Sequence, residues 1–552
     1  MSEHESASLV KTLRPFHVWA LGVGIVLVGE YMGWNFTVAK GGVLGSLLAM
    51  LVAGTMYVII SLCASELGSA TKLAGGPYDW ARLFIGPGAA ASVGLAVYME
   101  YIALEAADAI VVASISQSIF PELQVYPVTL LVIALLTFIN YRGVVAALTL
   151  NFVLTMIAFI AILAFFFSTA FGIGDIHPEY LLQGALPNGM IGLFAALQFG
   201  PWFYLGIEGA AMCAEECKHP SRAVPLGQQA GMITLLIGAA MTLYLCSVLI
   251  PADLLGVSVY PLFEAAQNSG VFIFVALLGL GTFLTCVASA NGCVCDSSRL
   301  LVCSLKRQLR VIRFSAVHPK YNTPYRAVIF TVPVAIGFAF SGYLDQVITF
   351  SIVSGLLCYV LIPFSLIRFR KLFPETTSKV RPFVGPLQPY IAYFAIAIAI
   401  TILSTLFWGY KYNLIFAFVS TVLRTSISAT NTRNQTLKIT GLKWAGPYPK
   451  AREIERSRRR QLALETNDQA LESKYHSKLT GDTALVVGML ALLICVEGFI
   501  AYKILSETWE IASGFFYLYV IFIGLIVLIE TIGCLKVRES IKTHMFEFKY
   551  YD

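Results

Sequence analysis

Charged residues are scarce in this chain of 552 residues, because Asp, Glu, Lys and Arg together make up only 13% of it. This is about half the share that is usual in soluble domains, so a soluble protein of this size could not cover its surface with charge. Segments such as 151–171 and 231–250 are instead apolar on every side of a helix. The chain is therefore predicted to be an all-α polytopic membrane protein.

Disulfide frameworks, histidine clusters and metal-ligand spacings are also missing from the sequence. The eleven cysteines mostly fall inside or at the ends of apolar segments, as packing residues do. Cys293 and Cys295 are two residues apart in a helical run, so their thiols do not share a helix face. No Ser/His pair appears at a catalytic spacing either. We therefore expect no enzyme activity, no catalytic residues, no metal and no cofactor.

Apolar runs of about 20 residues divide the chain into about fourteen membrane crossings. Their predicted centres lie near residues 28, 56, 100, 132, 160, 203, 239, 285, 333, 356, 399, 417, 495 and 524. The twelfth is the weakest, because its apolar run, 413–423, is only about half the usual span. The predicted domains are a cytoplasmic tail (1–14), a core of about twelve helices (15–424), a basic cytoplasmic linker (425–482), two additional helices (483–536) and a second cytoplasmic tail (537–552).

Basic residues are almost absent from every second loop between these crossings. If the N-terminus is cytoplasmic, the predicted outer loops hold only Lys40, Lys411 and Lys503 of the 38 Lys and Arg. Cytoplasmic loops carry the excess of Lys and Arg in membrane proteins, so both termini are predicted to be cytoplasmic. The expected location is the cell membrane, with many crossings.

The net charge of +6 belongs to one segment. Residues 424–480 hold twelve Lys and Arg and five Asp and Glu, whereas the rest of the chain holds 26 and 27. We interpret the segment as a solvated linker, partly a charged helix near anionic lipid head groups, and leave a partner-binding role as the alternative. The charge therefore gives no indication of a nucleic acid partner.

Two carboxylates flanked by glycine lie in the middle of apolar segments. The first segment contains Gly29-Glu30-Tyr31-Met32-Gly33-Trp34-Asn35, and the sixth contains Trp202-Phe203-Tyr204-Leu205-Gly206-Ile207-Glu208-Gly209. A carboxylate at that depth costs several kcal/mol unless it faces a water-filled site or a partner. Helices broken at matching positions of two repeats point to the midplane binding site of a transporter. The alternatives are a capping or paired role for Glu30 and ordinary packing for Trp202 and Tyr204.

The third crossing is unusually acidic, with Glu100, Glu105 and Asp108 and no basic residue. At 100° per residue, Glu105 and Asp108 lie about 60° apart around the helix, and Asp108 lies about 80° from Glu100. The three carboxyls form a broad polar face rather than a catalytic dyad. We expect this face to contact water or a cation, or else its carboxyls to be kept protonated by burial.

Several runs carry a family resemblance over about residues 12–410. They are Gly22-Val23-Gly24 with Gly29 to Asn35, Ser65-Glu66-Leu67 with Gly75-Gly76-Pro77-Tyr78, Phe194 to Gly209 with Glu215 to Pro225, Ala288 to Gly292 with Ser298 to Leu301, and Asn322 to Ala327. These runs resemble the amino acid–polyamine–organocation superfamily and, within it, the ethanolamine permeases. The resemblance implies the leucine-transporter type of fold, a five-plus-five inverted repeat, and alternating access with substrate held at the breaks in the first and sixth helices.

Glu30 narrows the class of substrate that the resemblance implies. Amino-acid permeases usually leave the break in the first helix free of acidic groups, so that backbone N–H groups can hold a substrate carboxylate. Glu30 would repel a carboxylate and attract an ammonium group. We therefore predict a secondary transporter in the lipid bilayer that takes up ethanolamine or a similar small amine. The predicted substrate-binding residues are Gly29, Glu30, Tyr31, Gly33, Trp34, Glu100, Trp202, Tyr204, Gly206 and Glu208, with cation–π contacts from the aromatic rings.

The sequence is also compatible with other functions. One is an amino-acid or polyamine permease of the same superfamily, and another is a transport-incompetent sensor that signals through 425–482. Many proton-coupled members of the superfamily carry a lysine in the fifth helix, and the stretch 143–171 has none. A proton symporter with Glu30, Glu100 or Glu208 as the carrier is one hypothesis, and the oligomeric state is undetermined.

Overall fold

The computed structural model describes residues 13–142, 144–181, 184–304, 318, 321, 323–340, 344–372 and 381–409, together with 528 and 532. Within them the chain forms fifteen α-helices and three 3-10 helices, and its only β-bridge joins Leu13 to Cys217. The predicted all-α fold is confirmed. The expected twelfth crossing, the linker 425–482 and the two additional helices of 483–536 lie outside the described residues, apart from 528 and 532.

Helical structure lies at each of the first eleven predicted crossings. In chain order they are α1 (Pro15–Val26) with α2 (Val28–Tyr31), α3 (Phe36–Thr71), α5 (Pro87–Ile119), α6 (Val125–Arg142), α7 (Val144–Ala170), α8 (Gly189–Ala196) with η2 (Gly200–Phe203) and η3 (Ile207–Glu216), α9 (Pro220–Leu249), α12 (Phe272–Ser304), α13 (Tyr325–Ala339), α14 (Leu344–Leu372) and α15 (Tyr390–Gly409). Short helices between them are α4 (Gly76–Phe84), η1 (Pro178–Leu181), α10 (Ala252–Leu255) and α11 (Pro261–Asn268).

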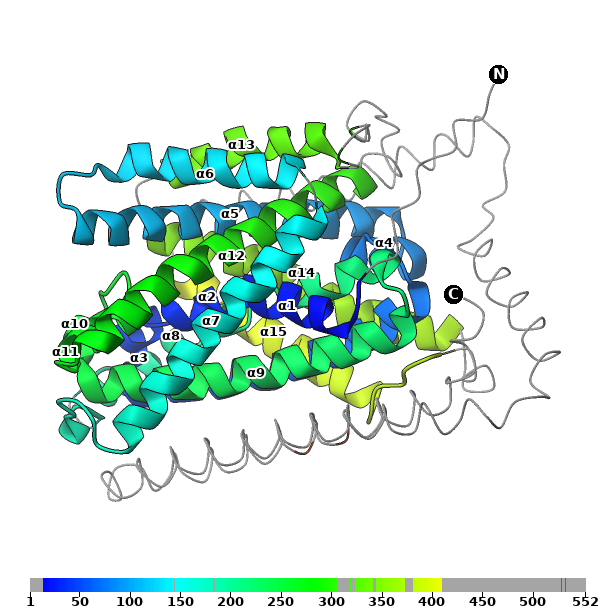
Figure 1. Cartoon of the computed structure of the whole chain (residues 1–552). Helices are drawn as coiled ribbons and strands as arrows, with labels where there is room; N and C mark the ends of the chain where they lie inside the picture. The colour runs from blue at the N-terminus through cyan, green and yellow to red at the C-terminus, as the bar shows by residue number, and fades with distance from the viewer. Residues whose placement is uncertain are drawn as a thin grey trace, which may run out of the picture.

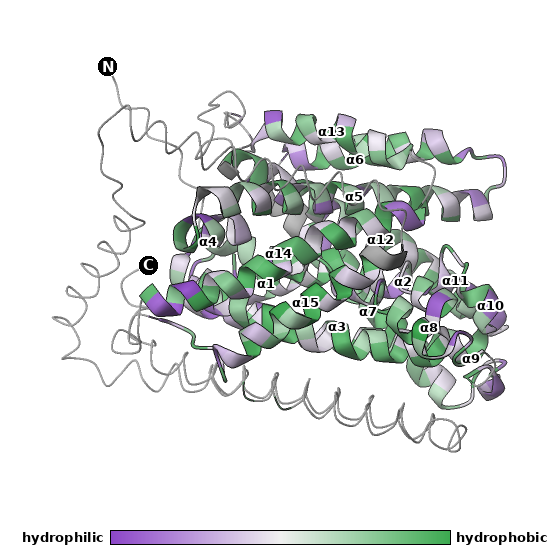
Figure 2. Ribbon diagram, turned by 180° about the vertical axis from the view of Figure 1, so that it is seen from behind, coloured by the Kyte–Doolittle hydropathy of each residue, from purple (hydrophilic) through white to green (hydrophobic). Residues whose placement is uncertain are grey.

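Six of the helices in the described residues are long and apolar enough to cross a bilayer. They lie in Phe36–Thr71, Val125–Arg142, Thr149–Ala170, Pro220–Leu249, Phe272–Val302 and Leu344–Leu372. The outer face of α6 exposes large apolar side chains, including Leu131, Leu135 and Phe138. Hydrophilic residues gather towards the two ends of the bundle (Figure 2). This distribution is that of a helical bundle in lipid.

The first ten crossings form two sets of five, with a short helix at the corresponding place in each set. In the first set, the short helix α4 stands between the second and third crossings; in the second set, α11 stands between the seventh and eighth. The two short helices lie at opposite ends of the bundle (Figure 1). Such a pattern is typical of the inverted repeat of leucine-transporter folds. The predicted five-plus-five core is therefore confirmed as the fold class.

The first and sixth crossings are broken, as the glycine-flanked motifs predicted. Helix α2 ends at Tyr31; Met32 after it is extended (φ −157°, ψ 160°), and Gly33 follows with φ +84°. In the sixth crossing, Gly206 has φ +98° between η2 and η3. Glycine adopts these left-handed conformations without the steric penalty of a side chain. Each break frees backbone groups near the middle of the bundle.

Candidate functional site

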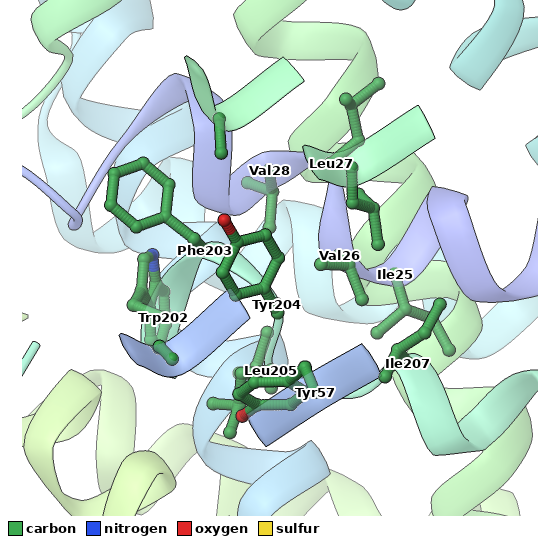
Figure 3. Packing of buried hydrophobic residues seen from close by; sticks show 14 of the residues in the cluster. Ile25, Val26, Leu27, Val28, Tyr57, Trp202, Phe203, Tyr204, Leu205 and Ile207 are labelled. Carbon is green, nitrogen blue, oxygen red and sulfur yellow. The ribbon is translucent and has the colours of Figure 1, made fainter. Parts of the chain in front are cut away.

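Trp202 joins the two helix breaks. Its indole Nε1 donates a hydrogen bond of 2.7 Å to the carbonyl oxygen of Met32, which directly follows α2. A methyl group at Gly33 would lie only 2.5 Å from the same nitrogen. One residue further, the ring of Trp34 stacks on Phe203 with centroids 5.3 Å apart. The aromatic run of the sixth crossing therefore packs directly on the break in the first (Figure 3).

Four residues beside these breaks form what we call the carboxyl cluster: Glu100, Tyr101, Glu208 and Tyr359. The Tyr359 hydroxyl lies 3.0 Å from both Glu100 Oε1 and Glu208 Oε2. The Tyr101 hydroxyl donates to Glu208 Oε1 at 3.0 Å. All four residues are buried. The cluster unites α5, η3 and α14, which come from separate parts of the chain.

The Tyr359 hydroxyl cannot donate a hydrogen bond to both neighbouring carboxylates at once. Its hydroxyl accepts a 3.1 Å bond from the N–H of Gly206 and has a single hydrogen to donate. It can therefore donate to Glu100 or to Glu208, but not to both. The second contact becomes a hydrogen bond only when that carboxyl carries a proton itself. An ammonium group, with three donors, could instead bind both carboxylates.

The cluster contains no counter-ion of its own. Neither Glu100 nor Glu208 forms an ion pair within the described part of the chain, and Glu100 Oε2 has no hydrogen-bond partner there. A buried carboxylate without a partner is costly by several kcal/mol. The two carboxyls therefore favour occupation by a proton or by a cationic ligand.

Aromatic rings line the cluster on the side of α3. The ring of Tyr57 packs edge-on against Tyr359, with centroids 4.9 Å apart, and lies 5.6 Å from the ring of Tyr204. Figure 3 shows Tyr57, Tyr204 and Leu205 around the break in the sixth crossing. The face of an aromatic ring attracts a cation. The cluster therefore combines two buried carboxyls with neighbouring aromatic rings.

Glu30 and Tyr31 do not join the carboxyl cluster. Glu30 is fully buried, neither of its oxygens has a hydrogen-bond partner in the described structure, and its side chain lies against Gly238 of α9. The Tyr31 hydroxyl donates to the carbonyl of Ala158 on α7 at 2.8 Å. Gly29, by contrast, packs against the backbone of Trp202. Glu30 thus forms a separate buried carboxyl beside the first break.

Ion pairs join helices at the end of the bundle where Leu13 lies. Glu66 on α3 pairs with Arg370 and Arg381 and accepts a 2.8 Å bond from the N–H of Gly385. On η3, Glu216 pairs with Arg299 of α12 at 2.8 Å. The Glu66–Arg370 pair joins the second crossing to the tenth, whereas the Glu216–Arg299 pair joins the sixth crossing to the eighth within the second set.

Three tyrosines of the site were missed at the level of sequence. Tyr101 directly follows Glu100, so its adjacency was a usable signal. Tyr57 and Tyr359 lie in apolar stretches of α3 and α14, where nothing marks them apart from packing aromatics. Only the tertiary arrangement shows that Tyr359 bridges Glu100 and Glu208.

Comparisons with known proteins place these observations in a family. A sequence model of the amino acid permease family matches residues 17–429. An uncharacterized transporter of Rhizobium meliloti (strain 1021) is 44% identical over 415 residues, which cover 74% of this chain and 89% of the relative. The methylthioribose transporter of Bacillus subtilis (strain 168) is 25% identical over 422 residues, covering 71% and 88%. The amino-acid permease RocE of the same organism is 20% identical over 418 residues, covering 72% and 89%.

Proposed function

Because this chain belongs to the amino acid permease family, whose members are transporters and not enzymes, we propose that it carries ethanolamine or a similar small organic amine across the membrane. Transport runs towards the cytoplasm by alternating access, with the substrate held between the breaks of the first and sixth crossings. The substrate's ammonium group binds Glu100 and Glu208, and its hydrocarbon part packs on Tyr57 and Tyr204.

The observation that carries this proposal is the pair of buried carboxyls on either side of Tyr359. Their oxygens lie 3.0 Å from one hydroxyl that can donate to only one of them. An ammonium group supplies the missing donors and neutralises the buried charge. The tyrosine hydroxyl then holds both carboxyls in place around the amine.

A substrate that also bears a carboxylate fits this site less well. Glu100, Glu208 and Glu30 are all buried near the two breaks, and within the described residues none of them is paired with a cation. A substrate carboxylate placed among them would meet repulsion in a medium that screens charge poorly. Relatives that are named for an amino acid and for methylthioribose show that the family alone does not fix the substrate.

The test is uptake of labelled ethanolamine by the purified protein in liposomes, with competition by leucine, arginine and putrescine in separate arms. We expect ethanolamine to be taken up and to compete better than the other three. Stronger competition by leucine or arginine would favour an amino-acid permease, and stronger competition by putrescine would favour a polyamine permease. Deletion of 425–482 should leave ethanolamine uptake intact. Loss of uptake in the deletion variant would instead support a signalling role for that segment.

Glu30 has a separate place in this proposal. Its carboxyl lies beside the first break, on the side of α9, and does not contact the carboxyl cluster. We expect Glu30→Gln to abolish uptake without loss of folded protein, because the first break then loses the carboxylate that lies beside it. Normal ethanolamine uptake by this variant would remove Glu30 from the site and leave the carboxyl cluster as the amine site.

A further inference from the structure

The side chain of Asn35 lies inside the break of the first crossing. It is fully buried, and its Oδ1 accepts a hydrogen bond of 3.2 Å from the N–H of Gly33, the residue with φ +84°. The carbonyl of the same peptide group, that of Met32, accepts from the indole of Trp202. The peptide group in the middle of the break is therefore bound at its oxygen and at its hydrogen by two side chains of the protein itself.

The nitrogen of the Asn35 amide fixes the direction in which its oxygen points. Nδ2 donates to the carbonyl oxygen of Leu255 at 2.7 Å and to that of Ser258 at 2.8 Å. A side-chain amide has two N–H donors, and both are used here. Exchange of the oxygen and the nitrogen would place Oδ1 against two carbonyl oxygens and Nδ2 against an N–H group. Only the observed orientation makes hydrogen bonds, so Oδ1 faces the break.

The segment between α10 and α11 supports Asn35 from the other side. Leu255 is the last residue of α10, and Ser258 lies between α10 and α11. Gly256, between them, packs so closely on the start of α3 that an added Cβ would lie only 2.9 Å from the N and Cα atoms of Ala39. Real Cβ atoms essentially never come within 3.0 Å of such an atom. The two carbonyls that hold the amide of Asn35 thus belong to a closely packed contact.

The Gly33 N–H is a group that an anionic substrate could otherwise use. In transporters with broken helices, backbone N–H groups at a break bind anionic groups of the substrate, such as a carboxylate. Here the oxygen of Asn35 already accepts from this N–H. A substrate carboxylate would have to displace that oxygen and leave it buried without a donor, which costs free energy. An amine without a carboxylate does not need the Gly33 N–H.

We propose that Asn35 is a specificity-determining residue, which disfavours substrates with a carboxylate because it occupies the Gly33 N–H from within the protein. This inference rests on the proposed function and adds a second cause to its selectivity. The buried glutamates repel a carboxylate by their charge, whereas Asn35 takes away a hydrogen-bond donor at the break. Loss of the Asn35 oxygen should therefore shift the preference of the transporter towards an amino acid.

The experiment uses the full chain in liposomes, with unlabelled ethanolamine and serine competing in turn against labelled ethanolamine. The variants are Asn35→Ala and Asn35→Asp. Asn268→Ala is the matched control, because the Asn268 amide also donates to a carbonyl oxygen, that of Leu249. The ratio of the serine to the ethanolamine inhibition constant should fall about tenfold in Asn35→Ala, which frees a donor for a charged acceptor. It should stay at the wild-type value in Asn268→Ala.

The Asn35→Asp variant keeps an oxygen on the Gly33 N–H and adds a negative charge. Its serine to ethanolamine ratio should therefore equal or exceed that of the wild type. A purely structural role for Asn35 would weaken both competitors alike. An unchanged ratio in Asn35→Ala, or a lower ratio in Asn35→Asp, overturns the role of Asn35 and leaves the amine transporter intact.

A second measurement separates the two proposals. Absence of ethanolamine transport by the wild type refutes the proposed function. Thermal unfolding of the purified protein with added serine tests Asn35 without transport, because a ligand that binds the folded protein raises its melting temperature. Serine should raise the melting temperature of Asn35→Ala more than that of the wild type, and equal rises overturn the proposal.

Discussion

The substitution Glu208→Gln separates the charge of the carboxyl cluster from its hydrogen bonds. Glutamine keeps an oxygen that accepts from Tyr101, and its amide N–H can donate to the Tyr359 hydroxyl. Tyr359 can then donate its own hydrogen to Glu100, so that every contact of the cluster is satisfied. The fold should therefore be retained, and only the negative charge at residue 208 is lost.

The size of the effect follows from the contact that the substrate loses. A hydrogen bond to a charged group contributes about 1.5–3 kcal/mol, and 1.4 kcal/mol corresponds to a tenfold change in a binding constant. Ethanolamine should accordingly bind Glu208→Gln about 10- to 150-fold more weakly than the wild type. The variant should unfold at the same temperature as the wild type or at a higher one.

Calorimetric titration of ethanolamine into the detergent-solubilised protein measures this affinity, and thermal unfolding measures the stability. Glu122→Gln, in an exposed loop, serves as the control for loss of a carboxylate elsewhere. An unchanged affinity in Glu208→Gln, with normal stability, would refute the assignment of Glu208 to the ammonium group. Reduced affinity accompanied by a large loss of stability would instead assign Glu208 to holding the fold.

Three further predictions concern the two helix breaks and the loop that contains His177. Trp202→Phe should lower the melting temperature, because the buried carbonyl of Met32 loses its donor, at about 1–3 kcal/mol. Gly206→Ala should reduce the yield of monodisperse protein in size-exclusion chromatography, because the φ of +98° disfavours a side chain. In the loop before η1, a hydrogen bond to Glu179 raises the pKa of His177 above 6.5, so this contact stabilises the fold below pH 6.5 and is lost as the pH rises past the raised value. Glu179→Gln should bring the pKa of His177 back towards 6.5 in an NMR titration, and an unchanged value would contradict this cause.

The helix breaks could be predicted from the sequence because their signal is local. A carboxylate between glycines is conspicuous in an apolar run, and it occurs in both the first and sixth crossings. The structure accordingly has non-helical backbone at Gly33 and Gly206. The fold class was predictable for the same reason, since apolar length and repeat position are properties of single segments.

The partners of each carboxyl were not predictable, because they depend on helix rotation and on contacts between distant segments. One residue of helix turns the side chain by about 100°, so Gly29 faces Trp202 while Glu30 faces Gly238. Glu100 and Glu208 meet only through Tyr359, which lies more than 150 residues beyond Glu208 in the chain. A single sequence contains no signal for such a pairing.

The most direct test of the central claim compares ethanolamine with serine, which has the same ammonium and hydroxyl groups and an added carboxylate. Each unlabelled compound is titrated against labelled ethanolamine uptake in proteoliposomes that contain the wild-type protein. If Glu100 and Glu208 select an amine without a carboxylate, ethanolamine should compete strongly and serine at least tenfold more weakly, by about 1.4 kcal/mol or more. Equal or stronger competition by serine would contradict the account.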